Sequence, residues 1–386
     1  VTSGDTGEAT VSPASLTFTT GNWDTPQTVT ITGVEGASVS DSTTTTITVS
    51  VNDGSSEDNY DSVSDQTVST TFTIISAVTQ ISTPTNDTTP SYVFTTNKTG
   101  TVTTNIAQGI LSGGTVTSTG NNTVTFNTLP EGTYTDKTIT FTDAANNTSS
   151  LTLTTFVVDT TPPTISDITT SAFSWGTHLN ATEDNSNGTV SVTTVGVEDG
   201  RTVTITLNGS TYTNTVSSNA TTVTITAAGL QGLTEGSVTM TADVSDAAGN
   251  AASQITSSSF SVDTTVPTMT IASTTSGVTD GSTTNDSSIA LTFTSSEATT
   301  NFVAGDITVS GGTLSSFSAT SSTVYTATFT PSASGATTID VAGGAFTDAV
   351  GNNNTAATQF NWTYDGTAPT MTIASTTSGV TDGSTT

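Results

Sequence analysis

Short runs in which apolar and polar residues alternate recur along almost the whole chain. Clear examples are TVTFNTL at 123–129, TVTITLN at 202–208, TTVTITA at 221–227 and SIALTFT at 288–294. A period of two places one set of side chains on a core face and the other in solvent, which is the pattern of a half-buried β-strand. Threonine and valine dominate these runs, and both favour strands. The pattern predicts an all-β protein.

Two kinds of polar loop divide these strands into blocks. The first kind is a short linker that ends in proline, and it occurs as Asp159-Thr-Thr-Pro-Pro163, Asp263-Thr-Thr-Val-Pro267 and Asp365-Gly-Thr-Ala-Pro369. The second kind precedes each linker and reads DAANN at 143–147, DAAGN at 246–250 and DAVGN at 348–352. Successive linkers lie about 100 residues apart, which is the length of one small β-sandwich domain. Each D-A-x-x-N segment is expected to form the hairpin loop before the last strand of a domain.

An exact internal duplication supports a tandem array. Residues 369–386 repeat residues 267–284 letter for letter, as PTMTIASTTSGVTDGSTT. Since repeats at a fixed period indicate one structural unit per repeat, we predict β-sandwich modules in an extended array. The modules expected are 79–160, 161–264 and 265–366, with the start of another at 367–386 and a first module of a different type at 1–78.

The charge balance and the cysteine count restrict the function. The chain has 32 acidic residues against 3 basic ones, a formal net charge of −29, and no cysteine. Nucleic acid is therefore not expected as a partner, because phosphate binding needs lysine and arginine. Disulfides and thiol chemistry are excluded. No run of residues is long and apolar enough to predict a membrane span or a signal peptide within this sequence.

The linker and loop motifs resemble those of bacterial Ig-like repeats from very large secreted surface adhesins. The resemblance covers residues 79–386 and is close in VEDGRTVTITLNGSTY, VSDAAGN and SFSVDTT, all between 197 and 265. It implies Ig-like β-sandwiches, secretion or a cell-surface location, a stalk or extender role, and structural calcium at the joints between modules. The opening segment, VSPASLTFTTGNWDTPQTVTITGVEG, is similar to Calx-β-type repeats but lacks their acidic cluster, so we expect no metal site there.

The topology of an Ig-type sandwich then suggests where calcium binds. A chain that enters at one end and leaves at the other brings each linker to the B–C and F–G loops of the module that follows. The first expected ligand set is Asp159 with Glu198, Asp199, Asp246 and Asn250, and Asp87 behind it. The second is Asp263 with Glu297, Asp348 and Asn352, and Glu183 and Asp184 behind it. Linker Asp365 is expected near Asp280 and Asp286. Several hard oxygen ligands from two modules favour calcium over magnesium.

The joint before residue 79 is expected to differ. Its linker, IISAVTQIS, has no acidic residue, and Lys98 stands where the module at 265–366 has Glu297. We therefore expect no calcium there, and Lys98 beside Asp143 instead. A simpler interpretation covers all the D-A-x-x-N segments, because aspartate and asparagine form turns through their own side chains without any ion.

Other conspicuous residues predict structure rather than chemistry. His178 is the only histidine, so a Ser-His-Asp arrangement would have to be built on it, and we expect no enzymatic activity. Acidic pairs such as Glu183-Asp184 lie in loops with no sign of a cleft. Tyr134 is expected to form a tyrosine corner. The three tryptophans, Trp23, Trp175 and Trp362, are expected to pack in cores.

Together these features predict a non-catalytic, calcium-stiffened stalk whose partners are the neighbouring repeats of the same chain. Three alternatives remain open at this point. The array could be a self-assembling filament or matrix fibre in which other copies of the chain pair sideways. One module could bind carbohydrate, or the repeats could decorate a phage particle.

Overall fold

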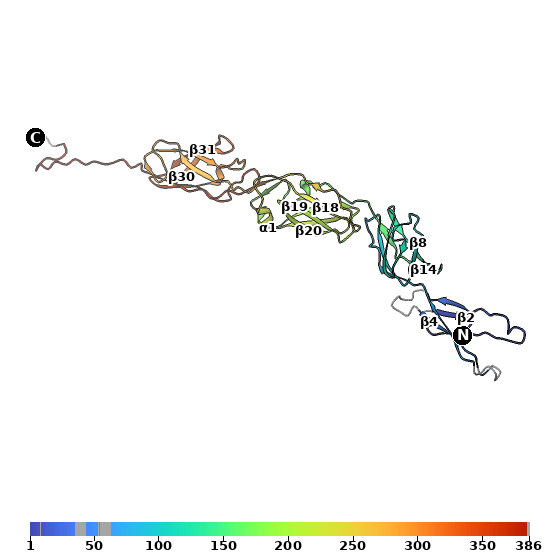
Figure 1. Cartoon of the computed structure of the whole chain (residues 1–386). Helices are drawn as coiled ribbons and strands as arrows, with labels where there is room; N and C mark the ends of the chain where they lie inside the picture. Colours follow the sequence, from blue (N-terminus) through green and yellow to red (C-terminus); the bar gives the residue numbers. More distant parts are fainter. Residues whose placement is uncertain (8, 35–43, 53, 55–62, 384–386) are drawn as a thin grey trace. The chain divides into compact units, whose positions relative to one another are not determined.

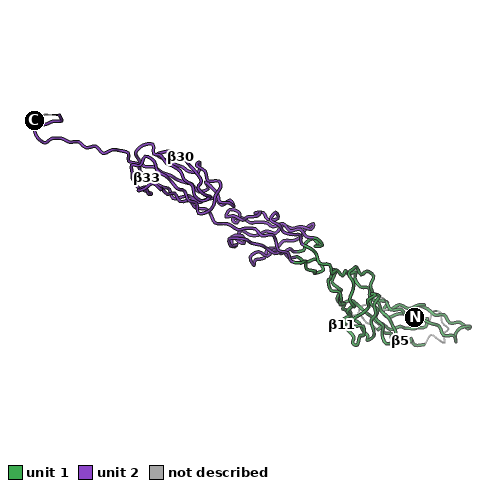
Figure 2. The backbone as a smooth tube through the Cα atoms, turned by 90° about the horizontal axis from the view of Figure 1, so that it is seen from above, with its two compact units in different colours: residues 1–164, 195–201, 244–253 green, residues 165–194, 202–243, 254–386 purple. Residues whose placement is uncertain are grey.

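The computed structural model of this chain describes all residues except 8, 35–43, 53, 55–62 and 384–386. The chain forms two compact units (Figure 2). Unit 1 comprises residues 1–164, 195–201 and 244–253, and unit 2 comprises 165–194, 202–243 and 254–386. Almost all of the regular structure is antiparallel β-sheet (Figure 1), which confirms the predicted fold class. None of the helices in the described part is long and apolar enough to cross a membrane.

The first sheets of unit 1 are small. They consist of β1 (Thr2–Ser3), β4 (Thr44–Val49) and β5 (Gln66–Thr71) in the order β1-β4-β5, and of the hairpin β2 (Ala9–Ser12) and β3 (Thr30–Gly33). Trp23 is 71% exposed here, so the prediction that it packs in a core is wrong. It lies in a stretch of turns and bends between β2 and β3, where no strand holds it against a sheet.

The remaining sheets of unit 1 enclose one hydrophobic core. One sheet has the order β6-β7-β11-β9, from β6 (Ile75–Thr79), β7 (Ser91–Thr96), β11 (Gly120–Phe126) and β9 (Ile110–Ser112). The other has the order β10-β8-β13-β14, from β10 (Thr115–Val116), β8 (Gly100–Thr104), β13 (Thr138–Asp143) and β14 (Thr148–Thr152). A short pair joins β12 (Gly132–Tyr134) to β15 (Phe156–Val158). Buried rings such as Phe94, Phe126 and Phe141 fill the core, as alternating strands require.

Tyr134 forms the expected tyrosine corner. Its hydroxyl donates to the carbonyl oxygen of Pro130 at 2.8 Å. Its ring stacks on Phe156, with the centroids 4.9 Å apart. The corner therefore ties the turn before β12 to the strand that leads into the Asp159 linker.

The first part of unit 2 contains three small sheets. Their orders are β16-β18-β21, β17-β25-β22 and β20-β19-β23-β24. The strands are β16 (Thr164–Ile165), β17 (His178–Asn180), β18 (Gly188–Val195), β19 (Thr202–Leu207), β20 (Ser210–Thr215), β21 (Ala220–Ile225), β22 (Gly236–Val238), β23 (Thr241–Asp243), β24 (Ile255–Thr256) and β25 (Phe260–Asp263). Three short helices interrupt them, η2 (Thr170–Ala172), η3 (Glu183–Asn185) and α1 (Ala227–Gln231). Trp175 packs on Phe173 and Phe260, with ring centroids 5.3 Å away in each case, so its predicted core role is confirmed.

The second part of unit 2 is a sandwich of two four-stranded sheets. One has the order β26-β28-β31-β30, from β26 (Met269–Ser273), β28 (Ile289–Ser295), β31 (Val324–Pro331) and β30 (Gly312–Ala319). The other has the order β27-β33-β32-β29, from β27 (Thr283–Thr284), β33 (Phe360–Tyr364), β32 (Gly335–Val341) and β29 (Ile307–Ser310). The short helix η4 (Ala304–Asp306) precedes β29. Trp362 is buried in this core, as predicted, against the edge of Phe329.

A parallel pairing recurs just before each linker. Early residues of the block pair in parallel with its last strand, as Thr85 with Val158, Asn180 with Asp263, and Thr284 with Tyr364. Asp263 is itself a linker aspartate, and the linker aspartates Asp159 and Asp365 directly follow Val158 and Tyr364. The register therefore places an asparagine beside every linker aspartate. The asparagines are Asn86, Asn180 and Asn285.

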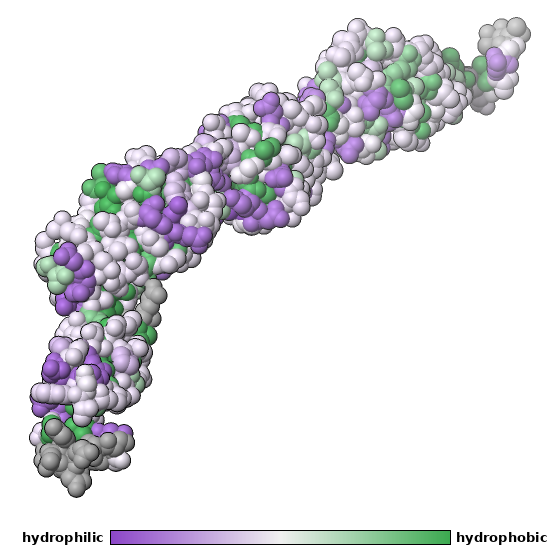
Figure 3. Space-filling view, turned by 90° about the vertical axis from the view of Figure 1, so that its right-hand side faces the viewer, coloured by the Kyte–Doolittle hydropathy of each residue, from purple (hydrophilic) through white to green (hydrophobic). Residues whose placement is uncertain are grey.

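The surface matches the composition. The face visible in Figure 3 is mostly pale, the colour of residues with near-neutral hydropathy, and strongly hydrophilic residues form small scattered groups on it. A threonine-rich sequence with few charged residues gives such a surface.

Candidate metal centre at the Asp263 linker

The loop Asp348–Asn352 folds around one buried carboxylate. Asp348 Oδ1 accepts hydrogen bonds from the backbone N–H groups of Val350, Gly351 and Asn352, at 2.8 to 3.0 Å. Gly351 has a φ of 99°, a conformation that residues with a side chain rarely adopt. Aspartate at the first position and glycine at the fourth are thus what allow this tight turn. The sequence motif D-A-V-G-N is explained by this geometry.

The side chain of Asn352 connects this loop to two other segments of unit 2. Its Nδ2 donates to Asp348 Oδ2 at 2.8 Å and to the backbone oxygen of Asp263 at 2.8 Å. Its Oδ1 accepts from the backbone N–H of Ala181 at 2.7 Å. Asn180 adds a contact from its Nδ2 to the oxygen of Val350 at 3.2 Å. The loop is therefore bound to the Asp263 linker and to the segment after β17.

Three carboxylates meet at this point. Asp263, Glu297 and Asp348 each offer an oxygen, and these oxygens all lie within 4.8 Å of one another. Asp263 is the last residue of β25, Glu297 follows β28, and Asp348 is the buried member. The structure thus brings together three of the residues expected around this linker.

The cluster is electrostatically unfavourable as it stands. Burial raises the pKa of Asp263, and the neighbouring charge of Asp348 raises it further. Burial also raises the pKa of Glu297, with added contributions from Asp263 and Asp348. Glu235 contributes to both shifts, and His178 opposes the shift at Asp263. Either protons or a cation would relieve this repulsion.

The donor set fits a hard divalent cation. Carboxylate oxygens from three residues are the ligands that calcium prefers, with water or backbone oxygens completing six to eight positions. Asn352 was expected among the ligands, but both polar atoms of its side chain already have protein partners. Glu183 likewise accepts from the backbone N–H of Asn180 at 3.1 Å. Burial raises the pKa of Asp184.

The Asp159 linker in unit 1 shares the loop geometry but not the carboxylate cluster. Asn250 Nδ2 donates to the backbone oxygen of Asp159 and to Asp246 Oδ2, both at 2.9 Å. Glu198 Oε2 accepts from the backbone N–H of Ala247 at 2.8 Å. Among the described residues, the carboxylates expected at this linker do not form a group of three within 4.8 Å.

The other acids expected at the joints are placed in turns. Asp87 Oδ1 accepts from the backbone N–H of Thr89 at 2.8 Å. Asp365 Oδ1 accepts from Thr367 at 3.0 Å, and Asp280 Oδ1 from Asn361 at 2.7 Å. Asp286 accepts from the hydroxyl of Thr284, and Asp199 is exposed. Their role as ligands stays a prediction.

Asp143 is held by hydrogen bonds rather than by Lys98. Its carboxylate accepts from Asn147, from the backbone N–H of Ala145, and from the Thr73 hydroxyl at 2.7 Å. The hydrogen bonds from Asn147 and Thr73 hold the pKa of Asp143 well below its ordinary value, with no contribution from Lys98. Asp143 therefore bonds to the neutral hydroxyl of Thr73, in the segment before β6, and not to Lys98 as expected.

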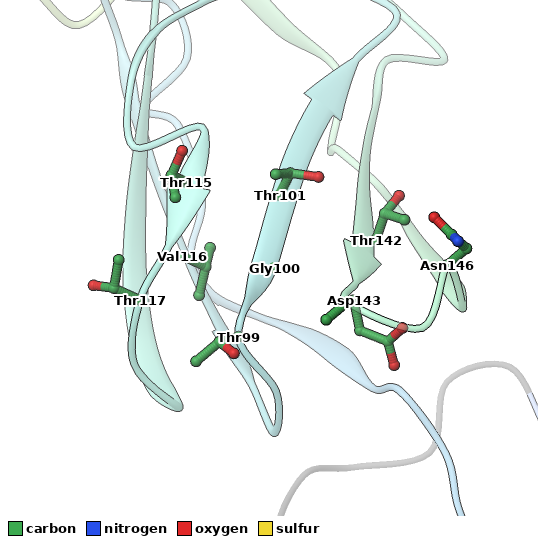
Figure 4. A pocket seen from close by; sticks show the side chains of 10 residues that line it. Thr99, Gly100, Thr101, Thr115, Val116, Thr117, Thr142, Asp143 and Asn146 are labelled. Carbon is green, nitrogen blue, oxygen red and sulfur yellow. The ribbon is translucent and has the colours of Figure 1, made fainter.

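A hollow of about 570 Å³ lies beside Asp143 (Figure 4). Its lining consists mostly of small polar residues of β8, β10 and the end of β13, namely Thr99, Gly100, Thr101, Thr115, Val116, Thr117, Thr142, Asp143, Ala144 and Asn146. Asp143 is the only acid among them, and its oxygens are already occupied. This lining offers neither a nucleophile with a base nor a pair of carboxylates.

Two functional candidates were missed from the sequence. Glu131 accepts from the hydroxyls of Thr160 and Thr161, at 3.1 and 2.8 Å. Glu235 accepts from the Thr264 hydroxyl at 2.8 Å. The signal was present, since L-x-E-G occurs twice at the same distance before a linker.

The comparisons with known families agree with the fold. Residues 263–364 match the model of a bacterial Ig-like domain, and residues 120–232 match that of a bacterial Ig-like domain of group 3. The chain therefore consists, in these stretches, of bacterial Ig-like repeats in tandem. No curated protein matches the sequence. The similarity of the opening segment to Calx-β repeats stays a prediction.

Solved structures similar to this chain include several adhesins. A Ca²⁺-stabilised adhesin with which an Antarctic bacterium binds ice is 24% identical, with 87% of this chain and 84% of that chain covered and a TM-score of 0.36. A 1.5-MDa bacterial ice-binding adhesin is 22% identical, over 76% and 97% of the two chains, with a TM-score of 0.33. An Ig-like domain of the M. primoryensis ice-binding adhesin is 30% identical, over 26% and 95%, with a TM-score of 0.19.

Proposed function

We propose that this chain is a non-catalytic length of stalk from a secreted or cell-surface bacterial adhesin, and that calcium at the Asp263 linker stiffens it. Tandem Ig-like repeats separated by short linkers that carry proline support a spacer role, because each repeat contacts only its neighbours. The partners are then the adjacent repeats of the same chain. The division into modules at 79, 161, 265 and 367 belongs to this proposal.

The observation that carries the calcium proposal is the group Asp263, Glu297 and Asp348. Asp263 belongs to the linker, whereas Glu297 and Asp348 lie in two loops that follow it in the sequence by 34 and 85 positions (297 − 263 and 348 − 263). An ion bound by all three would therefore tie the linker to the sandwich of β26 to β33. Such a tie limits rotation about the linker.

The repulsion within the group explains why a cation is favoured. Two unit charges 4 Å apart repel by about 4 kcal/mol at an effective dielectric of 20. With three basic residues in the chain, side chains of opposite sign are scarce. A divalent cation that binds only the folded linker removes this repulsion and stabilises the fold by mass action.

The experiment compares the full chain in calcium and in chelator. We expect chelation to lower the melting temperature and to broaden the distribution of dimensions measured by small-angle scattering. Isothermal titration calorimetry should detect calcium binding that the Asp263→Asn variant weakens. Equal melting and scattering in the two conditions, with no heat of binding, would show that calcium has no role here.

A further inference from the structure

We propose that the Asp159 and Asp263 linkers are each also held from two sides by side chains that need no ion: a glutamate from the block before the linker and an asparagine from the loop after it. The pairs are Glu131 with Asn250 at the Asp159 linker, and Glu235 with Asn352 at the Asp263 linker. This deepens the stiffening role proposed above, but it makes stiffness at the Asp159 linker independent of calcium.

The first half of the clamp is clearest at Glu131. This residue stands in the turn before β12, and its Oε2 accepts from three donors in the linker. They are the Thr160 hydroxyl at 3.1 Å, the Thr161 hydroxyl at 2.8 Å and the Thr160 backbone N–H at 3.4 Å. The hydrogen bonds from Thr161 and Thr160 lower the pKa of Glu131. A carboxylate that accepts several bonds fixes the backbone between its donors.

The same arrangement recurs at the next linker. Glu235, in the turn before β22, accepts from the Thr264 backbone N–H at 3.0 Å and from its hydroxyl at 2.8 Å. The third linker shows a matched change. Its second residue is Gly366 instead of threonine, and a shorter side chain, Ser334, accepts from the Gly366 N–H at 3.0 Å. At all three linkers, therefore, a side chain from the equivalent turn of the preceding block accepts a hydrogen bond from the linker.

The second half of the clamp comes from the D-A-x-G-N loop. Asn250 Nδ2 donates to the Asp159 carbonyl at 2.9 Å, and Asn352 Nδ2 donates to the Asp263 carbonyl at 2.8 Å. In both loops the second bond of the amide goes to the first aspartate of the motif, Asp246 or Asp348. The amide is thus oriented by its own loop before it reaches the linker.

At the Asp159 linker the clamp and one backbone hydrogen bond join the two sides. The carboxylate of Glu198 is bonded to Ala247, and among the described residues the acids expected here form no group of three within 4.8 Å. Asn86 adds a backbone bond from its N–H to the oxygen of Ala248 at 3.2 Å. Hydrogen bonds, rather than carboxylates that face one another, join the two sides here.

The test measures the spread of distances across the Asp159 linker. The chain has no cysteine, so Thr154→Cys and Ser253→Cys, both at exposed positions, give one spin-label pair in the full chain. Double electron–electron resonance then measures the distribution of distances between the two spin labels, in excess calcium and in chelator. We expect a narrow distribution in both conditions, broadened by Glu131→Ala and broadened further when Asn250→Ala is added.

Two controls keep the result interpretable. The double variant Thr160→Val with Thr161→Val removes the hydroxyl donors and leaves the glutamate, so it should also broaden the distribution. Asp167→Ala removes an exposed acid outside the clamp and should leave the distribution unchanged. Circular dichroism of each variant shows whether the sheets are intact.

The outcomes separate this proposal from the calcium proposal. A wild-type distribution that is narrow in calcium and broad in chelator would overturn the clamp and leave calcium as the stiffening agent. An unchanged distribution in Glu131→Ala and in the double threonine variant would overturn the clamp as well. A distribution that is narrow in both conditions and broadens in both of these variants supports it, whether or not calcium binds at Asp263.

Discussion

The side-chain amide of Asn352 donates a hydrogen bond to the backbone carbonyl of Asp263, 89 positions earlier, at 2.8 Å. Asn250 and Asp159 form the same bond at 2.9 Å across 91 positions. In both pairs the asparagine closes a D-A-x-G-N loop and the aspartate opens a linker. A motif that resembles an ordinary turn in the sequence therefore also supplies the side chain that donates a hydrogen bond to the linker.

The loop around Asp348 should contribute measurably to stability. Asp348→Ala leaves three backbone N–H groups without their acceptor and removes one of the two acceptors of the Asn352 amide. Because an unsatisfied buried donor costs about 1–3 kcal/mol, we expect the free energy of unfolding to fall by at least this amount in urea titrations. Asp382→Ala, at an exposed position, is the matched control. A loss no larger than that of the control would contradict the prediction.

Calcium binding should depend on the Asp263 cluster more than on the Asp159 set. We expect Asp263→Asn to reduce the calcium-dependent rise in melting temperature, since it removes one of three grouped carboxylates. At a calcium concentration 100 times the dissociation constant, that rise corresponds to about 2.7 kcal/mol. Differential scanning calorimetry measures it, and Asp246→Asn is the comparison. If Asp246→Asn reduces the calcium-dependent rise in melting temperature more than Asp263→Asn does, the principal calcium site lies at the Asp159 linker instead.

Asp143 should make the fold sensitive to acid. Hydrogen bonds from Asn147 and Thr73 lower its pKa from the ordinary value of 3.8. A carboxyl group with a lowered folded-state pKa contributes stability above its unfolded pKa, and that stability is lost as the pH falls through the folded-state pKa. The melting temperature should therefore decrease as the pH is lowered below 3.8. Asp143→Asn should show a shallower acid dependence; curves of equal slope for the two proteins would refute this assignment.

Gly188 should not tolerate a side chain. A Cβ atom there would lie 2.5 Å from Trp175 Cζ3 and 2.7 Å from Cε3. Because Trp175 is packed against Phe173 and Phe260, the ring has little room to move, and overpacking of this kind costs about 1–3 kcal/mol. Chemical denaturation of Gly188→Ala measures the loss. Gly305→Ala is the control, since no atom lies within 4 Å of its Cβ position, and similar values for the two variants would disprove the clash.

Much of the architecture could be predicted from local pattern. Alternation at 123–126 and 202–207 located β11 and β19, because a strand with one buried face requires a period of two. The spacing of linkers and loops identified the repeats. Trp23 shows the limit of this approach, because a large ring indicates a core only where neighbouring strands enclose it.

The candidate site was predicted in part. The direction of the chain through a sandwich placed Asp263 near Glu297 and Asp348, which the structure brings together. At the Asp159 linker, by contrast, Glu198 bonds to the backbone of Ala247, a contact that the sequence does not indicate. Which oxygen faces which donor depends on side-chain conformations within a few ångströms, and the spacing of residues in a sequence does not contain that information.

The duplicated segment separates what the sequence determines from what the tertiary structure decides. By itself, PTMTIASTTSGVTDGSTT establishes a repeat and a strand-forming pattern. At 267–284 it contains β26 and β27, and Met269 is 3% exposed because β26 pairs with β28. At 369–383 the same residues form no strand in the described part of the chain, and Met371 is 87% exposed. The local pattern sets which side chains could be buried, but a strand is stable only when a neighbour supplies its hydrogen bonds and covers its apolar face.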